Sequence, residues 1–169
     1  SALYTVVVTN GAAGVKDLAG NELLNVFTAS FTTTDQASYT IWPASAAPSP
    51  SGLENGDTTA IAQGIQLGVK FRSSVNGYVT GIRYYKGTNN TGPHIGNLWT
   101  TNGTLLRTAP FAGETISGWQ QVSFPNPVPI ARNTTYVASY HTLAGFYAQD
   151  AQYFQTGGTD NGPLHALAE

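Results

Sequence analysis

The chain has 169 residues, including 19 Gly, 9 Pro and 19 aromatic side chains (9 Tyr, 7 Phe and 3 Trp), but only 7 basic and 9 acidic ones. The scarcity of charge argues against long amphipathic helices, and a net charge of −2 without a basic run argues against nucleic acid as a partner. The absence of cysteine excludes disulfides and zinc-thiolate sites, and no apolar run is long enough to predict membrane insertion. An all-β fold is therefore expected.

The chain opens on an alternating strand, SALYTVVVT, in which Tyr4, Val6 and Val8 share one face. A loop at residues 10–24 leads to a second alternating run, VFTASFTTTD. Two strands and a loop do not make a stable domain. We therefore expect this stretch to be the end of a domain whose front strands lie outside the sequence.

These residues resemble the C-terminal part of the bacterial Ig-like modules typified by S-layer proteins. Such modules commonly end in a tyrosine-bearing strand, a Val-Lys-Asp-Leu-Ala-Gly-Asn turn and a Phe-Thr-Thr strand, which stand here at Tyr4, 15–21 and 31–33. The resemblance implies that residues 1–35 are the C-terminal strands of an Ig-like domain.

The junction DQASYTIWPASAAPSPSG carries Pro43, Pro48 and Pro50, which cannot donate to a strand ladder, so we expect an extended arm or edge segment. We assign residues 36–169 to a second domain, in which strand-like runs recur between turn signals. Asn76-Gly77 and Asn102-Gly103 are dipeptides typical of hairpin turns. We predict an antiparallel β-sandwich of the jelly-roll type. The expected strands are IQLGVKF (65–71), YVTGIRYYK (78–86), GNLWT (96–100), TLLRTAPF (104–111), WQQVSF (119–124) and TYVASYH (135–141).

The second domain resembles an uncharacterised bacterial family known as domain of unknown function 4082, over roughly residues 38–169. The resemblance rests on the motifs at 81–87, 96–99, 118–120 and 135–141. It implies a secreted or cell-surface bacterial protein with several domains, in which this module lies beside Ig-like or carbohydrate-active domains. The family usually continues into further strands, which implies that a closing strand lies beyond Glu169 or comes from another chain.

Strand alternation assigns the aromatic side chains to faces. With Ile82 and Tyr84 in the core, Arg83 and Tyr85 point outward. Outward aromatic rings near amide, guanidinium and imidazole groups are typical of a sugar platform, because the C–H face of a pyranose stacks on an aromatic ring.

The same reasoning turns Asn97 and Trp99 outward if Leu98 is in the core, and Trp119 outward if Val122 is. The alternative is that each tryptophan packs under a loop as part of the core. The predicted ligand-binding residues are Arg83, Tyr85, His94, Asn97, Trp99, Glu114 and Trp119, with Tyr140, His141 and Tyr147 as outer candidates.

Metal binding has weaker support. The three histidines are far apart and show no ligand spacing, so we expect them to be structural or on the surface. Glu54, Asn55 and Asp57 gather three oxygen-bearing side chains in one turn and form a candidate calcium site, although Asp and Asn also favour turns for backbone reasons. Asp17 and Asn21 present the same two alternatives.

Three functions remain open. The first is a noncatalytic module that binds carbohydrate or cell-surface polysaccharide, without a cofactor other than calcium. The second is a structural spacer or assembly module that uses exposed strand edges and contacts neighbouring Ig-like domains. The third is a polysaccharide-active enzyme that uses Tyr140, His141 and Arg83, which requires these side chains to share a cleft.

Overall fold

The computed structural model describes residues 2–33, 37–52, 55–56 and 63–168. The chain divides into two compact units, Ser1–Ser38 and Tyr39–Glu169. The described elements are antiparallel strands and one short 3-10 helix, so the predicted all-β fold is confirmed. No helix in the described part of the chain is long and apolar enough to cross a membrane.

The first unit is a hairpin of two antiparallel strands, β1 (Ala2–Val8) and β2 (Phe27–Thr33). Tyr4 lies opposite Phe31, and the two rings stack with centroids 5.5 Å apart. Val6 and Phe27 lie on the same face, because directly paired residues point to one side. All four side chains are about half exposed.

The loop of the hairpin is closed by Asp17. Its Oδ1 accepts hydrogen bonds from the backbone N–H groups of Ala19 and Asn21, each 2.9 Å long, and its Oδ2 accepts one from the Asn21 side chain. Hydrogen bonds from Asn21 lower the pKa of the Asp17 carboxyl. Both carboxylate oxygens therefore serve the turn, as expected for Asp in this kind of loop.

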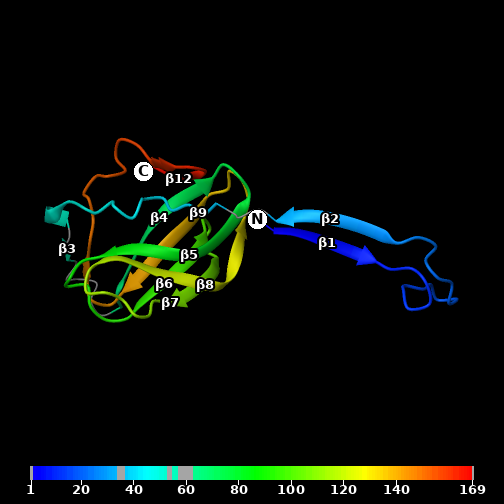
Figure 1. Ribbon diagram of the computed structural model, residues 1–169. Helices are drawn as coiled ribbons and strands as arrows, with labels where there is room; N and C mark the ends of the chain where they lie inside the picture. The colour runs from blue at the N-terminus through cyan, green and yellow to red at the C-terminus, as the bar shows by residue number, and fades with distance from the viewer. Residues whose placement is uncertain (1, 34–36, 53–54, 57–62, 169) are drawn as a thin grey trace. The chain divides into compact units, whose positions relative to one another are not determined.

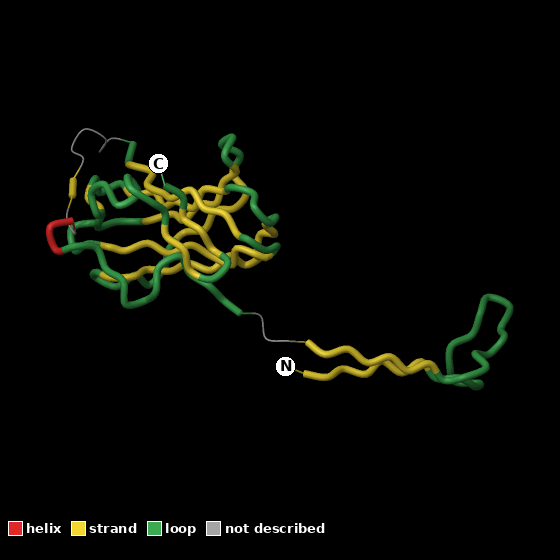
Figure 2. Tube along the Cα trace, turned by 90° about the horizontal axis from the view of Figure 1, so that it is seen from above, coloured by secondary structure: helices red, strands yellow, loops and turns green. Residues whose placement is uncertain are grey.

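The second unit is a β-sandwich (Figures 1 and 2). One layer is a six-stranded sheet of order β11-β12-β4-β9-β6-β7, and the other contains the long pair β5-β8. A further small sheet pairs β3, which comes after the helix η1 in the chain, with β10. The bounds are η1 Pro50–Gly52, β3 Asn55–Gly56, β4 Ile65–Ser73, β5 Gly77–Lys86, β6 His94–Thr100, β7 Leu105–Pro110, β8 Gly118–Ile130, β9 Tyr136–Thr142, β10 Phe146–Tyr147, β11 Thr159–Asn161 and β12 Leu164–Ala166.

The core lies between these two layers. Leu98 of β6 is completely buried, and Phe71 and Tyr136 pack beside it from β4 and β9. Ile82 and Phe124 face them from β5 and β8. Every second residue of each strand enters this core, and the residues between them point away from it.

Each of the six strands predicted in this unit is present, and all ends but one lie within two residues of the prediction. The exception is β8, which continues six residues beyond the predicted end at Phe124. Its pairing with β5 is interrupted by a register shift at residues 124–127 and resumes at Val128. The Asn102-Gly103 turn connects the paired strands β6 and β7 as expected, with Gly103 at a φ of 87°. The Asn76-Gly77 hairpin prediction is wrong, because β4 and β5 belong to different sheets.

Residues 39–50 form an arm that packs along the sandwich without joining a sheet. Ile41 packs against the core, and the Thr40 carbonyl accepts a hydrogen bond from the Asn161 side chain. Farther along, the Ser49 N–H donates to the carboxylate of Asp150 at 2.8 Å. The arm thus covers core that the two-stranded layer leaves open.

Candidate functional site

The ten predicted ligand-binding residues do not gather at one place. Trp99 lies on the outer face of the six-stranded sheet, whereas Arg83, Tyr85 and Trp119 lie on the outer face of the β5-β8 pair. These two faces point away from the shared core in opposite directions. The remaining predicted residues are mostly buried. The structure therefore offers two outer surfaces and one interior cluster as candidate sites.

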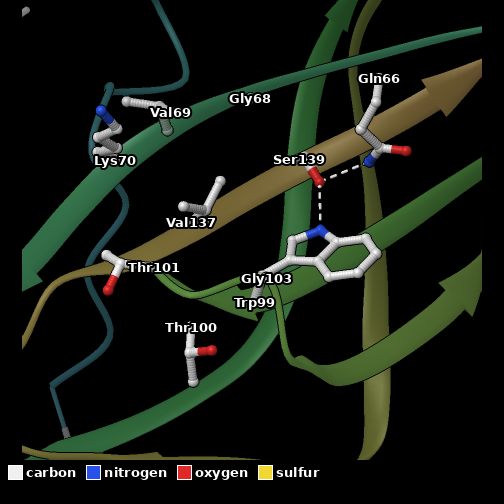
Figure 3. A pocket seen from close by; sticks show the side chains of 10 residues that line it. All are labelled: Gln66, Gly68, Val69, Lys70, Trp99, Thr100, Thr101, Gly103, Val137 and Ser139. Atoms are coloured by element: carbon white, nitrogen blue, oxygen red, sulfur yellow. Dashed lines mark hydrogen bonds between the residues drawn. The ribbon is translucent and has the colours of Figure 1, made fainter.

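The first surface holds a groove of about 360 Å³ across strands β4, β9 and β6 (Figure 3). Trp99 is half-buried, and its Nε1 donates a 2.8 Å hydrogen bond to Ser139 Oγ. Gln66 Nε2 donates a 2.6 Å bond to the same oxygen. The first bond fixes the indole to β9, and the second holds the Ser139 hydroxyl that accepts it. The lining residues are Gln66, Gly68, Val69, Lys70, Trp99, Thr100, Thr101, Gly103, Val137 and Ser139.

Gly68 lines this groove from the middle of β4. A Cβ at this position would stand 2.7 Å from Ser139 Cβ and 2.6 Å from the Ala138 carbonyl oxygen, closer than packing allows. A glycine inside a strand commonly marks a place where another group approaches the backbone. Gly68 therefore leaves a low stretch in the sheet surface beside the indole of Trp99.

On the opposite surface, Trp119 is enclosed by its neighbours. The Arg83 guanidinium carbon lies 4.6 Å from the Trp119 ring centroid, and Tyr85 contacts the ring edge-on. Trp42 of the arm stacks on Trp119 with centroids 6.5 Å apart, and Trp119 Nε1 donates to the Ala46 carbonyl at 2.7 Å. Burial lowers the pKa of Arg83. This surface holds the arm in place and leaves little of the Trp119 ring open.

The third group is a buried cluster around Glu114. Its carboxylate accepts hydrogen bonds from Tyr84 Oη at 2.9 Å and Lys86 Nζ at 2.7 Å, and His94 Nδ1 lies 2.9 Å from both of its oxygens. The Glu114 and Lys86 side chains are 11% and 10% exposed, and His94 is completely buried. The ring of Tyr140 stacks on Tyr84 at a centroid distance of 4.1 Å.

The cluster continues to Asn90, whose Oδ1 lies 2.9 Å from His94 Nε2 and accepts a 2.6 Å bond from Thr142 Oγ1. Burial raises the pKa of the Tyr140 hydroxyl, and an interaction with the Asn90 side chain acts in the opposite direction. Buried polar groups of this kind stabilise a core only when they are paired. The cluster therefore makes the interior sensitive to changes of charge.

Burial controls the electrostatics of the cluster. It lowers the pKa of His94, although the Glu114 carboxylate acts in the opposite direction, and it raises the pKa of the Tyr84 hydroxyl, as Glu114 also does. Burial alone would raise the pKa of Glu114, but hydrogen bonds from Lys86, Tyr84 and His94 outweigh it and leave the pKa low. Neutral His94 beside ionised Glu114 is the state that the fold favours.

We expect the free energy of unfolding to fall as the pH is lowered. Below about 6.5 the unfolded chain protonates its histidine while folded His94 resists protonation, and below about 4.5 the same holds for Glu114. Each group then favours the unfolded state. Urea unfolding from about pH 8 to about pH 4 measures the slope.

In this experiment the His94→Gln variant should show a smaller decrease in the free energy of unfolding as the pH is lowered from neutral. His165→Gln is the control, because His165 lies on β12 and bonds only the exposed Asp160. An unchanged slope in the His94 variant would contradict this account.

The other predicted residues lie apart from the groove lining or are buried. Asn97 is on the same face as Trp99 but is only 7% exposed, and its amide donates weakly to the Ile95 carbonyl at 3.4 Å. His141 lies farther along β9, 3.1 Å from the Gln63 carbonyl, and Tyr147 is in β10. Tyr140 faces the core.

The predicted calcium turn lies mostly outside the described residues. Glu54 and Asp57 lie outside the described residues, and of Asn55 only the backbone, in β3, is described. Among the residues with a described position, no group of three or more His, Asp or Glu side chains could hold a metal ion. Calcium binding by this turn stays a prediction.

The proposed catalytic combination of Tyr140, His141 and Arg83 is not assembled. Tyr140 points into the core, His141 to the outer face of the six-stranded sheet and Arg83 to the outer face of β5. No cleft contains all three side chains. Proton transfer by this set is therefore excluded.

Sequence reasoning missed Gln66, Lys70 and Ser139 in the groove and Lys86 and Asn90 in the cluster. Alternation places Gln66 and Lys70 on one face of their strand, and this signal was available. Their proximity to Trp99 depends on β9 lying between β4 and β6, which no local pattern reveals.

A family model described as "Domain of unknown function (DUF4082)" matches residues 48–169. The match covers most of the sandwich and does not reach the hairpin of residues 2–33. No curated protein and no solved structure matches the chain. The likeness of residues 1–35 to an Ig-like module stays a prediction.

Proposed function

The chain belongs to the family described as a domain of unknown function (DUF4082), and we propose that its sandwich is a noncatalytic module that binds carbohydrate. The observation that carries the proposal is the groove on the six-stranded sheet, where a half-buried tryptophan lies beside amide, hydroxyl and ammonium groups. We further propose that the parent protein is secreted or on the cell surface, where polysaccharide is available.

The chemistry of the groove suits a sugar. The indole of Trp99 offers an apolar surface for the C–H face of a pyranose ring. Gln66 and Thr101 offer hydrogen-bonding groups for its hydroxyls. Because Ser139 fixes the indole through Nε1, little ordering entropy is lost when a ligand binds. The groove runs across an open sheet face, which suits a segment of a long polymer.

We expect Trp99→Ala to weaken polysaccharide binding about tenfold or more, since a central aromatic anchor commonly contributes about 2 kcal/mol. Affinity electrophoresis against a broad panel of neutral and acidic polysaccharides measures the effect. Trp99→Phe should retain part of the affinity, because a ring remains without the Nε1 bond to Ser139.

Tyr78→Ala is the matched control. Tyr78 is 61% exposed and lies on β5, in the other layer of the sandwich, so removing it takes away an exposed ring without touching the groove. If no polysaccharide in the panel retards the chain, the proposal is wrong. Equal losses in the Trp99 and Tyr78 variants would place the binding site elsewhere.

A further inference from the structure

The groove is bordered by two cations on β4. Lys70 lines the groove, and Arg72 follows on the same face, because alternate strand residues point to one side. Phe71, between them, is buried in the core. In the register, Lys70 lies opposite Val137 of β9, and Arg72, one residue beyond the last β4–β9 pair, lies opposite His165 of β12.

Neither cation is neutralised within the described structure. Both side chains are exposed, and neither forms an ion pair with a described residue. The groove lining contains Lys70 and no acidic side chain. Asp160, the acidic residue on the described strands of this sheet, lies two strands away from Arg72 on β11 and is hydrogen-bonded to His165 at 2.7 Å. The groove face therefore carries positive charge on a chain whose net charge is −2.

We infer that the groove binds an acidic polysaccharide, with Trp99 against a sugar ring and Lys70 and Arg72 paired with anionic groups along the polymer. This inference rests on the proposed carbohydrate function and names its ligand class. The anionic group is a carboxylate or a sulfate, both of which accept hydrogen bonds from ammonium and guanidinium groups.

Charge complementarity separates acidic from neutral ligands. A neutral sugar in the groove would displace water from Lys70 without supplying a counter-charge, which is unfavourable. An anionic sugar supplies one through a charge-assisted hydrogen bond. Lys70 and Arg72 are about 7 Å apart along the strand, so separate anionic groups on an extended polymer can reach each of them.

Nucleic acid is a less suitable occupant. Its affinity depends on the number of phosphates that basic side chains neutralise, and this face offers two unpaired cations beside a single tryptophan. The hydroxyl and amide groups around Trp99 suit sugar hydroxyls better than a row of stacked bases.

The experiment compares the full chain on three polymers by isothermal titration calorimetry: polygalacturonate, a sulfated galactan and an unsubstituted galactan. Single-stranded DNA is the fourth ligand. Lys70→Gln and Arg72→Gln each remove one cation from the groove face. Lys16→Gln removes the same charge from the hairpin unit, where Lys16 is partly exposed beside Glu22, and is the charge-matched control.

We expect the chain to bind at least one acidic polymer more tightly than the neutral galactan. Each groove substitution should weaken that binding roughly three- to tenfold, and Lys16→Gln should leave it unchanged. Raising the salt from about 0.05 M to about 0.5 M should also weaken it, because salt screens exposed charges. Preference for polygalacturonate or for the sulfated galactan identifies the anionic group.

Four results would overturn the inference. If neutral and acidic polymers bind equally and the groove substitutions have no effect, the ligand is neutral and the proposed function survives. Equal losses from Lys16→Gln would mean that overall charge, not the groove, attracts the polymer. DNA binding that depends on Lys70 would make the groove a phosphate site. If no polysaccharide binds, the proposed function itself fails.

Discussion

Glu114→Gln lowers the free energy of unfolding by about 3–5 kcal/mol, because it leaves a buried ammonium without its partner. Lys86 and Glu114 are each about nine-tenths buried and lie 2.7 Å apart, so solvent does little to replace the lost charge. Tyr84 and His94 lose a charged partner at the same time. Urea unfolding at about pH 7, with the slope compared between variants, measures the loss.

The double variant Lys86→Met/Glu114→Gln is the control for this prediction. Removing both charges avoids an unpaired ammonium, so the double variant should be more stable than Glu114→Gln alone. Such non-additivity is expected for residues in direct contact. If the losses in free energy of unfolding caused by Lys86→Met and by Glu114→Gln add up to the loss in the double variant, the ion pair has no special importance to the fold.

The strands, and the face of the sheet on which each side chain lies, could be predicted from the sequence because side chains alternate with a period of two. Residues 78–86 illustrate this: Ile82 and Tyr84 are buried, as expected, while Arg83 and Tyr85 lie on the other face. Gln120 shares a face of its strand with Val122 and is likewise buried. These assignments need only the local strand and one apolar core residue.

The site could not be predicted in the same way, because it depends on which strands are neighbours. Trp99 and Trp119 both point outward from their strands, and alternation cannot tell that one strand is in each layer. Glu114 lies in the loop between β7 and β8, where no periodicity applies. Its contacts with Tyr84, Lys86 and His94 bring together segments that are 20 to 30 residues apart.

The ends of β8 and β5 show how local signals can mislead. The predicted strand ends at Phe124, directly before Pro125, Pro127 and Pro129. Among the described strands β8 pairs with β5 alone, and its register shifts at residues 124–127, so this irregular edge strand tolerates proline. Asn76-Gly77 has the composition of a hairpin turn, yet it connects the two layers, and the Asn76 side chain instead accepts a hydrogen bond from the Arg132 N–H.

Trp119→Ala lowers the free energy of unfolding by about 2–4 kcal/mol, somewhat less than a fully buried tryptophan would. The substitution removes the ring that Trp42 and Arg83 contact and the N–H that holds the Ala46 carbonyl. Because the arm forms no strand, these contacts are a large part of what fixes it. We therefore expect residues 39–50 to become sensitive to proteolysis while the sheets remain folded.

Trp119→Phe separates the ring from the hydrogen bond. It retains an aromatic partner for Trp42 and loses only the Nε1 donor to Ala46, so its cost should be nearer to 1 kcal/mol. Hydrogen exchange of the Trp42 and Ala46 amides should rise in the alanine variant well before exchange in β6 and β9 does. If arm and sheets exchange together in both variants, Trp119 supports the whole sandwich and the arm is not a separate element.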